Sequence, residues 1–163
     1  MFEDEILMLA QAVLDAHRAR GWHLATAESC TGGLVAGALT AIAGSSDVVE
    51  RGFVTYSNEA KSELLGVPLE TLAAHGAVSA ETAASMARGA VVRAPVDLAI
   101  SVTGIAGPGS ATPTKPVGLV LFGLARRDGS CRIESCLFSG DRSAVRKAAL
   151  VTALRLLEAE ASC

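Results

Sequence analysis

Residues 25–33 read Ala-Thr-Ala-Glu-Ser-Cys-Thr-Gly-Gly, and they lie between an apolar run and a second apolar stretch, residues 34–42. The second stretch has the character of a buried helix, so Ser29, Cys30 and Thr31 are expected where a strand turns into a helix. A helix start offers unpaired N–H groups that can hold an oxyanion or a phosphate. Gly32 and Gly33 would let another group approach the backbone closely. The residues predict a site at this junction and leave its chemistry open.

Composition indicates one compact domain, which we assign to residues 1–163. Apolar residues make up 50% of the chain and charged residues 19%, which excludes an intrinsically disordered protein. The aromatic share is only 4%, so no platform for stacking bases is expected. The formal net charge of −3 provides no basic field for nucleic acid or an anionic membrane.

No segment predicts a membrane span or a secretory signal. The apolar residues 34–43 are too few to cross a bilayer. The N-terminus, Met-Phe-Glu-Asp-Glu, is acidic and leads into an amphipathic helix. We therefore expect a cytoplasmic protein.

The four cysteines include no CxxC pair, and His17, His23 and His75 are scattered without an HExxH motif. Cys131 and Cys136 fall in one expected strand, an odd number of positions apart, so they should face opposite sides of it. A zinc site, a disulfide framework, metal catalysis and a thiol redox enzyme are not indicated, and no cofactor is expected. His17 follows the apolar stripe of the first helix and is interpreted as a packing or surface residue.

Helical and strand patterns alternate early in the chain, and a hairpin follows late. Helices are expected over 3–20, 31–43, 57–65, 68–75, 79–93 and from Asp141 to the end, the last with Val145, Ala149, Thr152 and Leu156 on its apolar stripe. Strands are expected over 22–27, 48–56, 97–103, 117–125 and 131–138, the last two joined at Asp128-Gly129. This order predicts an α/β fold whose sheet of about five strands is mixed because of the hairpin.

Tyr56 and Lys61 frame the boundary between the second strand and the third helix. Ser57 is a candidate N-cap, so Lys61 falls in the first helical turn, where the helix dipole disfavours a cation. Either Lys61 points to water, or its pKa is lowered for use as a base.

Residues 104–116 form the longest stretch rich in glycine and proline, and they follow the expected central strand. Such a loop is a common ligand-binding position in α/β proteins, although a plain linker has the same composition. Arg142, at the start of the last helix, is either a solvated charge or a guanidinium aimed at an anion.

Six motifs in this order resemble the CinA C-terminal domain family, and the resemblance covers residues 5–157. They are Thr26-Ala-Glu-Ser-Cys-Thr-Gly-Gly33, Gly52-Phe-Val-Thr-Tyr-Ser-Asn-Glu-Ala-Lys61, His75-Gly-Ala-Val-Ser79, Thr103-Gly-Ile-Ala-Gly-Pro108, Lys115-Pro-Val-Gly118 and Phe138-Ser-Gly-Asp-Arg142. Standalone members of the family are nicotinamide-nucleotide amidohydrolases with a three-layer α/β/α fold. The resemblance implies that nicotinamide mononucleotide, a small-molecule substrate, is deamidated to nicotinic acid mononucleotide and ammonia. It also implies a homodimer.

The resemblance assigns the nucleophile to Ser29, assisted by Tyr56 and Lys61, and leaves open which of these two takes the first proton. We expect the oxyanion donors to be N–H groups of residues 30–33, and the phosphate to meet the 104–109 loop and Arg142. The expected substrate-binding residues are Cys30, Thr31, Gly32, Gly33, Thr103, Gly104, Gly107 and Arg142. One departure from close relatives, Ser110-Ala111 in place of further glycine, bears on the fit of substrate in that loop.

Two alternatives accompany this interpretation. Cys30 is a rival nucleophile, because a helix N-terminus lowers the pKa of a thiol; the residues alone do not separate it from Ser29, and the resemblance favours Ser29. The chain could also be a non-catalytic nucleotide-binding module of a competence or damage pathway. Such a module has no need of Ser29, Tyr56 and Lys61 together.

Overall fold

A five-stranded sheet forms the middle of the molecule, and the computed structural model describes all residues from 1 to 163. The strands are β1 (Leu24–Glu28), β2 (Val49–Val54), β3 (Leu98–Gly104), β4 (Leu119–Arg126) and β5 (Cys131–Leu137), in the order β2-β1-β3-β4-β5. The first three pair in parallel, whereas β4 is antiparallel to both β3 and β5. The predicted mixed sheet is confirmed, with β3 at its centre.

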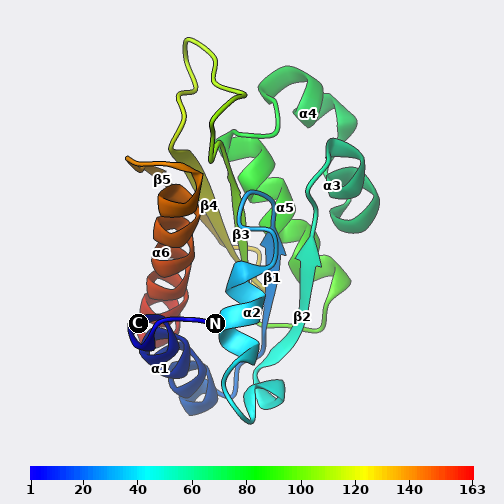
Figure 1. Cartoon of the computed structure of the whole chain (residues 1–163). Coiled ribbons are helices and arrows are strands. Elements are labelled where there is room, and N and C mark those ends of the chain that lie inside the picture. The colour runs from blue at the N-terminus through cyan, green and yellow to red at the C-terminus, as the bar shows by residue number, and fades with distance from the viewer.

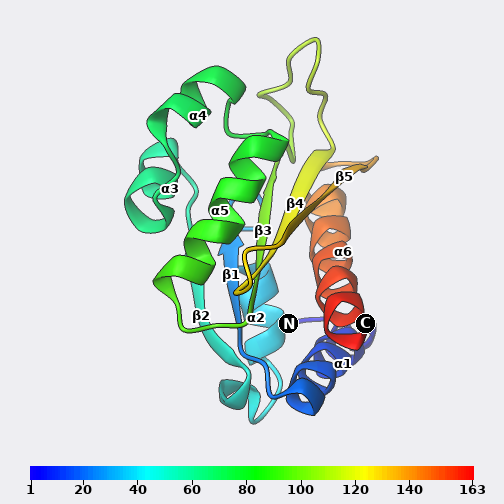
Figure 2. The ribbon, with the colours of Figure 1, turned by 180° about the vertical axis from the view of Figure 1, so that it is seen from behind.

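Helices cover both faces of the sheet, as Figures 1 and 2 show from opposite sides. One face carries α1 (Asp4–Arg20), α2 (Leu34–Thr40) and α6 (Arg142–Ser162), and the other carries α3 (Asn58–Leu65), α4 (Leu69–His75) and α5 (Ala80–Arg93). A short 3-10 helix, η1 (Ser45–Asp47), precedes β2. No helix is both long enough and apolar enough to cross a membrane. The three-layer α/β/α arrangement is confirmed.

The alternation of side chains along β3 explains the two layers. Leu98, Ile100 and Val102 pack into the core beneath α1 and α6, whereas Ala99 packs toward α5. On the α5 side Ser101 Oγ donates to the carbonyl of Ala83 at 2.6 Å. Small residues on that face let α5 lie close to the sheet.

Most helix ends follow the predicted capping residues. Ser57, Ser79 and Asp141 each accept a backbone N–H of the first helical turn, and Gly21 and Gly66 end their helices in the left-handed conformation. These local signals are reliable because each cap satisfies an orphan backbone group within a few residues.

The predicted stripe of the last helix is wrong in its second half. Val145 and Ala149 are buried, but Thr152 and Leu156 are only partly buried, and the buried row continues through Ala153, Leu154, Leu157 and Ala161. A helix has 3.6 residues per turn, so successive steps of four and three residues keep one face toward the sheet.

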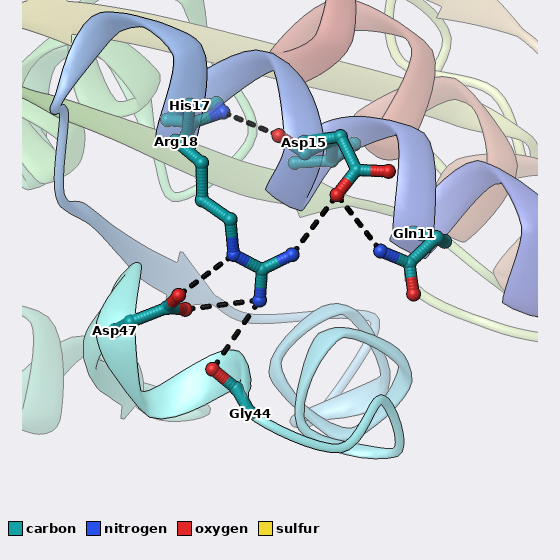
Figure 3. Close-up of polar contacts among 7 residues, drawn as sticks. Gln11, Asp15, His17, Arg18, Gly44 and Asp47 are labelled. Carbon is teal, nitrogen blue, oxygen red and sulfur yellow. Dashed lines mark hydrogen bonds and ion pairs between the residues drawn. The ribbon is translucent and has the colours of Figure 1, made fainter.

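A polar cluster ties α1 to η1, the short helix that precedes β2, and Figure 3 shows its contacts. Arg18 donates to both carboxylate oxygens of Asp47, to the carbonyl of Gly44 and to Asp15. His17 is buried, and its Nδ1 donates to the carbonyl of Val13 at 2.8 Å. Burial lowers the pKa of His17, in agreement with a packing role.

Candidate active site

The carboxyl ends of β1, β2 and β3 meet at one edge of the sheet, because these strands are parallel. A cavity of about 430 Å³ opens there, within the size range of small-molecule sites. Its lining comprises Ser29, Cys30, Tyr56, Lys61, Gly76, Ala77, Val78, Thr103, Gly104, Ile105, Ala106, Gly107, Gly109, Ser110, Thr112, Lys115 and Arg142. Five separate segments of the sequence therefore contribute to one site.

Ser29 and Lys61 meet at the buried end of this cavity. Lys61 Nζ lies 3.0 Å from Ser29 Oγ and 2.8 Å from the carbonyl oxygen of Thr55. The Lys61 side chain is only 1% exposed, and burial lowers its pKa. Of the two alternatives for Lys61, the structure excludes the one in which it points to water.

Tyr56 lies at the rim rather than at the buried end. It is 62% exposed, and its hydroxyl accepts a hydrogen bond from Arg142 Nη2 at 2.8 Å. Arg142 Nη1 donates to the carbonyl of Gly107 at 3.0 Å. Arg142 thus joins the tyrosine to the glycine-rich loop, and neither residue is hydrogen-bonded to Ser29 or Lys61.

The carboxylate of Glu28 occupies the start of α2, which the sequence interpretation did not foresee. It is fully buried and accepts the N–H groups of Gly33, Val35 and Ala36 at 3.0, 3.1 and 2.9 Å. The helix begins at Leu34, not at Thr31 as predicted. The first donors of α2 are therefore already satisfied and do not face a ligand.

Within the segment 29–33, only two N–H groups are without a partner in the protein. The Gly32 N–H donates to the Ser29 carbonyl and the Gly33 N–H to Glu28, which leaves Cys30 and Thr31. Of these two, Cys30 lines the cavity. The predicted set of donors at 30–33 is reduced accordingly.

Arg146, on α6, holds the other side of this segment. Its Nε donates to the carbonyl of Cys30 and its Nη2 to the carbonyl of Thr31, both at 3.1 Å. Sequence reasoning missed Glu28 and Arg146. The acidic Glu28 at the end of an apolar strand was an available signal, whereas nothing local marks Arg146.

The structure brings some of the expected binding residues together and leaves others apart. Cys30, Thr103, Gly104, Gly107 and Arg142 line the cavity with the three expected catalytic residues. Thr31, Gly32 and Gly33 do not line it. The glycines adopt φ angles of 61° and 97°, so they serve the turn that connects Ser29 to α2.

The environment of Cys30 contradicts the expectation of a lowered thiol pKa. Cys30 packs in the hydrophobic core, and burial raises its pKa to about 11. Desolvation is the largest cause of this rise, and the charge of the nearby Glu28 carboxylate raises the pKa further. A thiol in this setting stays protonated at neutral pH and is a poor nucleophile.

Electrostatically, the cavity suits an anion. Lys115 and Arg142 line it, and no aspartate or glutamate does, although the chain contains 17 acidic residues. Sequence reasoning did not assign Lys115 to the site. Its motif, Lys115-Pro116-Val117-Gly118, was the available signal.

Comparisons with known proteins agree on one family. The model of the CinA C-terminal domain matches residues 7–161. The chain is 51% identical over 157 residues to nicotinamide-nucleotide amidohydrolase PncC of Escherichia coli K12, covering 96% of this chain and 95% of that protein. It is 56% identical over 137 residues to a CinA-like protein of Citrifermentans bemidjiense, covering 84% of this chain and 33% of the relative. The crystal structure of competence/damage inducible protein CihA from Agrobacterium tumefaciens superposes with a TM-score of 0.94 at 48% identity, covering 98% of this chain and 97% of that one.

Proposed function

The chain belongs to the CinA C-terminal domain family, and from this membership we propose that it hydrolyses the carboxamide of nicotinamide mononucleotide, giving nicotinic acid mononucleotide and ammonia. The observation that carries the proposal is the buried contact between Lys61 Nζ and Ser29 Oγ at 3.0 Å. A nucleophile within hydrogen-bond reach of a base is the arrangement that acyl transfer requires.

In the first half-reaction neutral Lys61 takes the proton of Ser29 Oγ as this oxygen attacks the carboxamide carbon. Burial favours the neutral amine that this step needs, since it lowers the pKa of Lys61. The C–N bond then breaks, the proton passes from Lys61 to the leaving nitrogen, and ammonia departs from an acyl-enzyme ester on Ser29.

In the second half-reaction Lys61 takes a proton from water as the water oxygen attacks the ester. The bond to Ser29 Oγ breaks and the serine regains its proton from Lys61. The carboxylic acid product gives its proton to the released ammonia and leaves as a carboxylate. The atoms balance as amide plus water giving carboxylate plus ammonium.

We assign the first proton transfer to Lys61 rather than Tyr56. Lys61 is hydrogen-bonded to Ser29 Oγ, whereas the Tyr56 hydroxyl is bonded to Arg142 at the exposed rim. Tyr56 and Arg142 together then act on the substrate from the rim side. The developing oxyanion is assigned to the N–H of Cys30, which has no partner in the protein and belongs to a residue of the lining.

Ammonia release from nicotinamide mononucleotide tests the proposal, with wild type beside the matched variants Ser29→Ala and Cys30→Ala. Ser29→Ala should lower kcat by at least about 10⁴-fold, as loss of a nucleophile does. Cys30→Ala should keep kcat within about tenfold of wild type, since only packing is lost. If Cys30→Ala lost this activity and Ser29→Ala kept it, the nucleophile would be Cys30.

A wild-type protein that binds the nucleotide in calorimetry but releases no ammonia would contradict the enzyme and support the nucleotide-binding module. The homodimer and the cytoplasmic location implied by the resemblance stay predictions. The homodimer is checked by light scattering of the purified protein.

A further inference from the structure

The cavity has two chemically different ends. Ser29 and Lys61 are buried at one end, away from the open rim of the cavity. Lys115 is half-buried and Arg142 is exposed, so the remaining basic groups lie nearer to solvent. A ligand with an amide at one end and an anion at the other matches this polarity.

Lys115 is held in place by the turn on which it sits. Its backbone N–H and carbonyl both pair with Thr112, whose backbone groups complete a small antiparallel bridge. The Thr112 Oγ1 accepts a further bond from the Lys115 N–H at 3.1 Å. This turn lies in the loop between β3 and β4, which rises beside α4 at the carboxyl end of the sheet in both Figures 1 and 2.

The Lys115 ammonium spans from that loop to the last turn of α4. Its Nζ donates to the carbonyl of His75 at 2.5 Å, a favourable position at the negative end of a helix. An ammonium has three N–H donors, so two are left for a ligand in the cavity that Lys115 lines.

No carboxylate neutralises Lys115. It takes part in none of the protein's ion pairs, and no acidic residue lines the cavity. The contrast is Lys147, which is paired with Glu3 at 2.6 Å and lies outside the cavity. Of the three lysines in the chain, Lys61 serves the reacting end and Lys115 is the unpaired one near the rim.

We propose that Lys115 binds the phosphate of the substrate, and so makes the site select a mononucleotide over the corresponding nucleoside. The inference rests on the proposed function, from which the phosphate-bearing substrate is taken. The alternative is that Lys115 only ties the loop to α4. Because a tether would affect every ligand alike, a pair of ligands that differ only in the phosphate separates the two roles.

The test measures Kd by calorimetry for nicotinamide mononucleotide and for nicotinamide riboside. All proteins carry Ser29→Ala, so that no turnover occurs, and the added changes are Lys115→Met, Lys115→Arg and, as the matched control, Lys147→Met. Lys115→Met should raise the Kd for the mononucleotide by about 10- to 100-fold, the range for the loss of one charge-assisted hydrogen bond. Lys115→Met should leave the Kd for the riboside within about twofold of the parent value. Lys147→Met should change the Kd of neither ligand. Lys115→Arg should recover most of the affinity for the mononucleotide.

Three results would overturn the inference. Equal weakening of both ligands by Lys115→Met would reveal a tether, and unchanged affinity for both would remove any role in binding. Failure of the protein carrying Ser29→Ala alone to bind the mononucleotide would also overturn the inference. The proposed function fails separately, when wild type releases no ammonia, because binding to the Ser29→Ala proteins is measured without turnover.

Discussion

At the scale of single residues, Lys61 shows a conflict between local preference and tertiary placement. A lysine in the first turn of a helix is disfavoured by the dipole, and this one is also withdrawn from water. Its partners are a hydroxyl and a carbonyl, not a carboxylate. No carboxylate bonds to the amine, and burial lowers its pKa, which is the direction that a general base requires.

The lowered pKa of Lys61 predicts how activity depends on pH. The value of kcat/KM should fall as pH falls through the pKa of Lys61, because protonation removes the base. Lys61→Arg should be inactive throughout, since arginine does not deprotonate in proteins. A pH–rate series on both proteins checks this, and measurable activity of Lys61→Arg would contradict the assignment of Lys61 as base.

The same shift has a consequence for folding. Between the lowered pKa in the folded protein and about 10.4 in the unfolded chain, only the unfolded chain binds the proton. The free energy of unfolding therefore rises with pH across that window. Below the window Lys61 is protonated in both states, and the stability gained across the window is absent. Urea unfolding at several pH values should show this slope in wild type and a smaller one in Lys61→Met.

At the scale of elements, the start of α2 depends on a carboxylate from the preceding strand. Glu28 ends β1 and accepts three N–H groups of the segment that begins α2, while Arg146 holds two carbonyls of the segment between them. The turn that presents Ser29 is thus fixed from both sides. Asp141 caps α6 in a comparable but exposed way.

Replacing each capping carboxylate by its amide should separate the buried cap from the exposed one. Glu28→Gln should lower the free energy of unfolding by about 2 kcal/mol, because a buried charge-assisted network loses an acceptor. It should also lower kcat, because the Ser29 turn loosens. Asp141→Asn, the matched control, should change stability by less than about 0.5 kcal/mol, since asparagine caps as well as aspartate. Urea unfolding and steady-state assays measure both, and equal effects would contradict the role of Glu28.

At the scale of the whole molecule, the helix that carries Lys61, α3, packs closely against α5. A Cβ added at Gly89, on α5, would lie 2.0 Å from the carbonyl oxygen of Leu65, at the end of α3. Lys61 belongs to α3, so we expect its distance from Ser29 to depend on the contact between the two helices.

Gly89→Ala should force α3 away from α5 and lower the free energy of unfolding by about 1–3 kcal/mol, as overpacking does. It should also lower kcat, because Lys61 would move with α3. Gly37→Ala, in α2, is the matched control, because its Cβ would meet only Phe2 at an ordinary 3.5 Å. That change should raise stability by about 0.5–1 kcal/mol through helix preference. Thermal unfolding and steady-state assays of both variants measure the changes in stability and in kcat. An unaltered kcat in a destabilised Gly89→Ala protein would show that Lys61 does not depend on this contact.

The sequence by itself determined the order and type of the elements, the mixed sheet and most helix ends. Capping residues, periodicity and the Asp128-Gly129 hairpin act over a few neighbouring positions, so they can be recognised without knowing the fold. The motifs also indicated Ser29, Tyr56, Lys61 and Arg142, which the fold gathers around one cavity.

Only the tertiary structure decided what each of these groups faces. Burial raises the pKa of the Cys30 thiol and lowers the pKa of the Lys61 amine. Glu28 fills the helix start that was expected to face a ligand. Lys115 lines the cavity without a carboxylate partner. Protonation and donor availability depend on solvent exposure and on partners that are distant in sequence. These are properties of the packed chain, which no local pattern encodes.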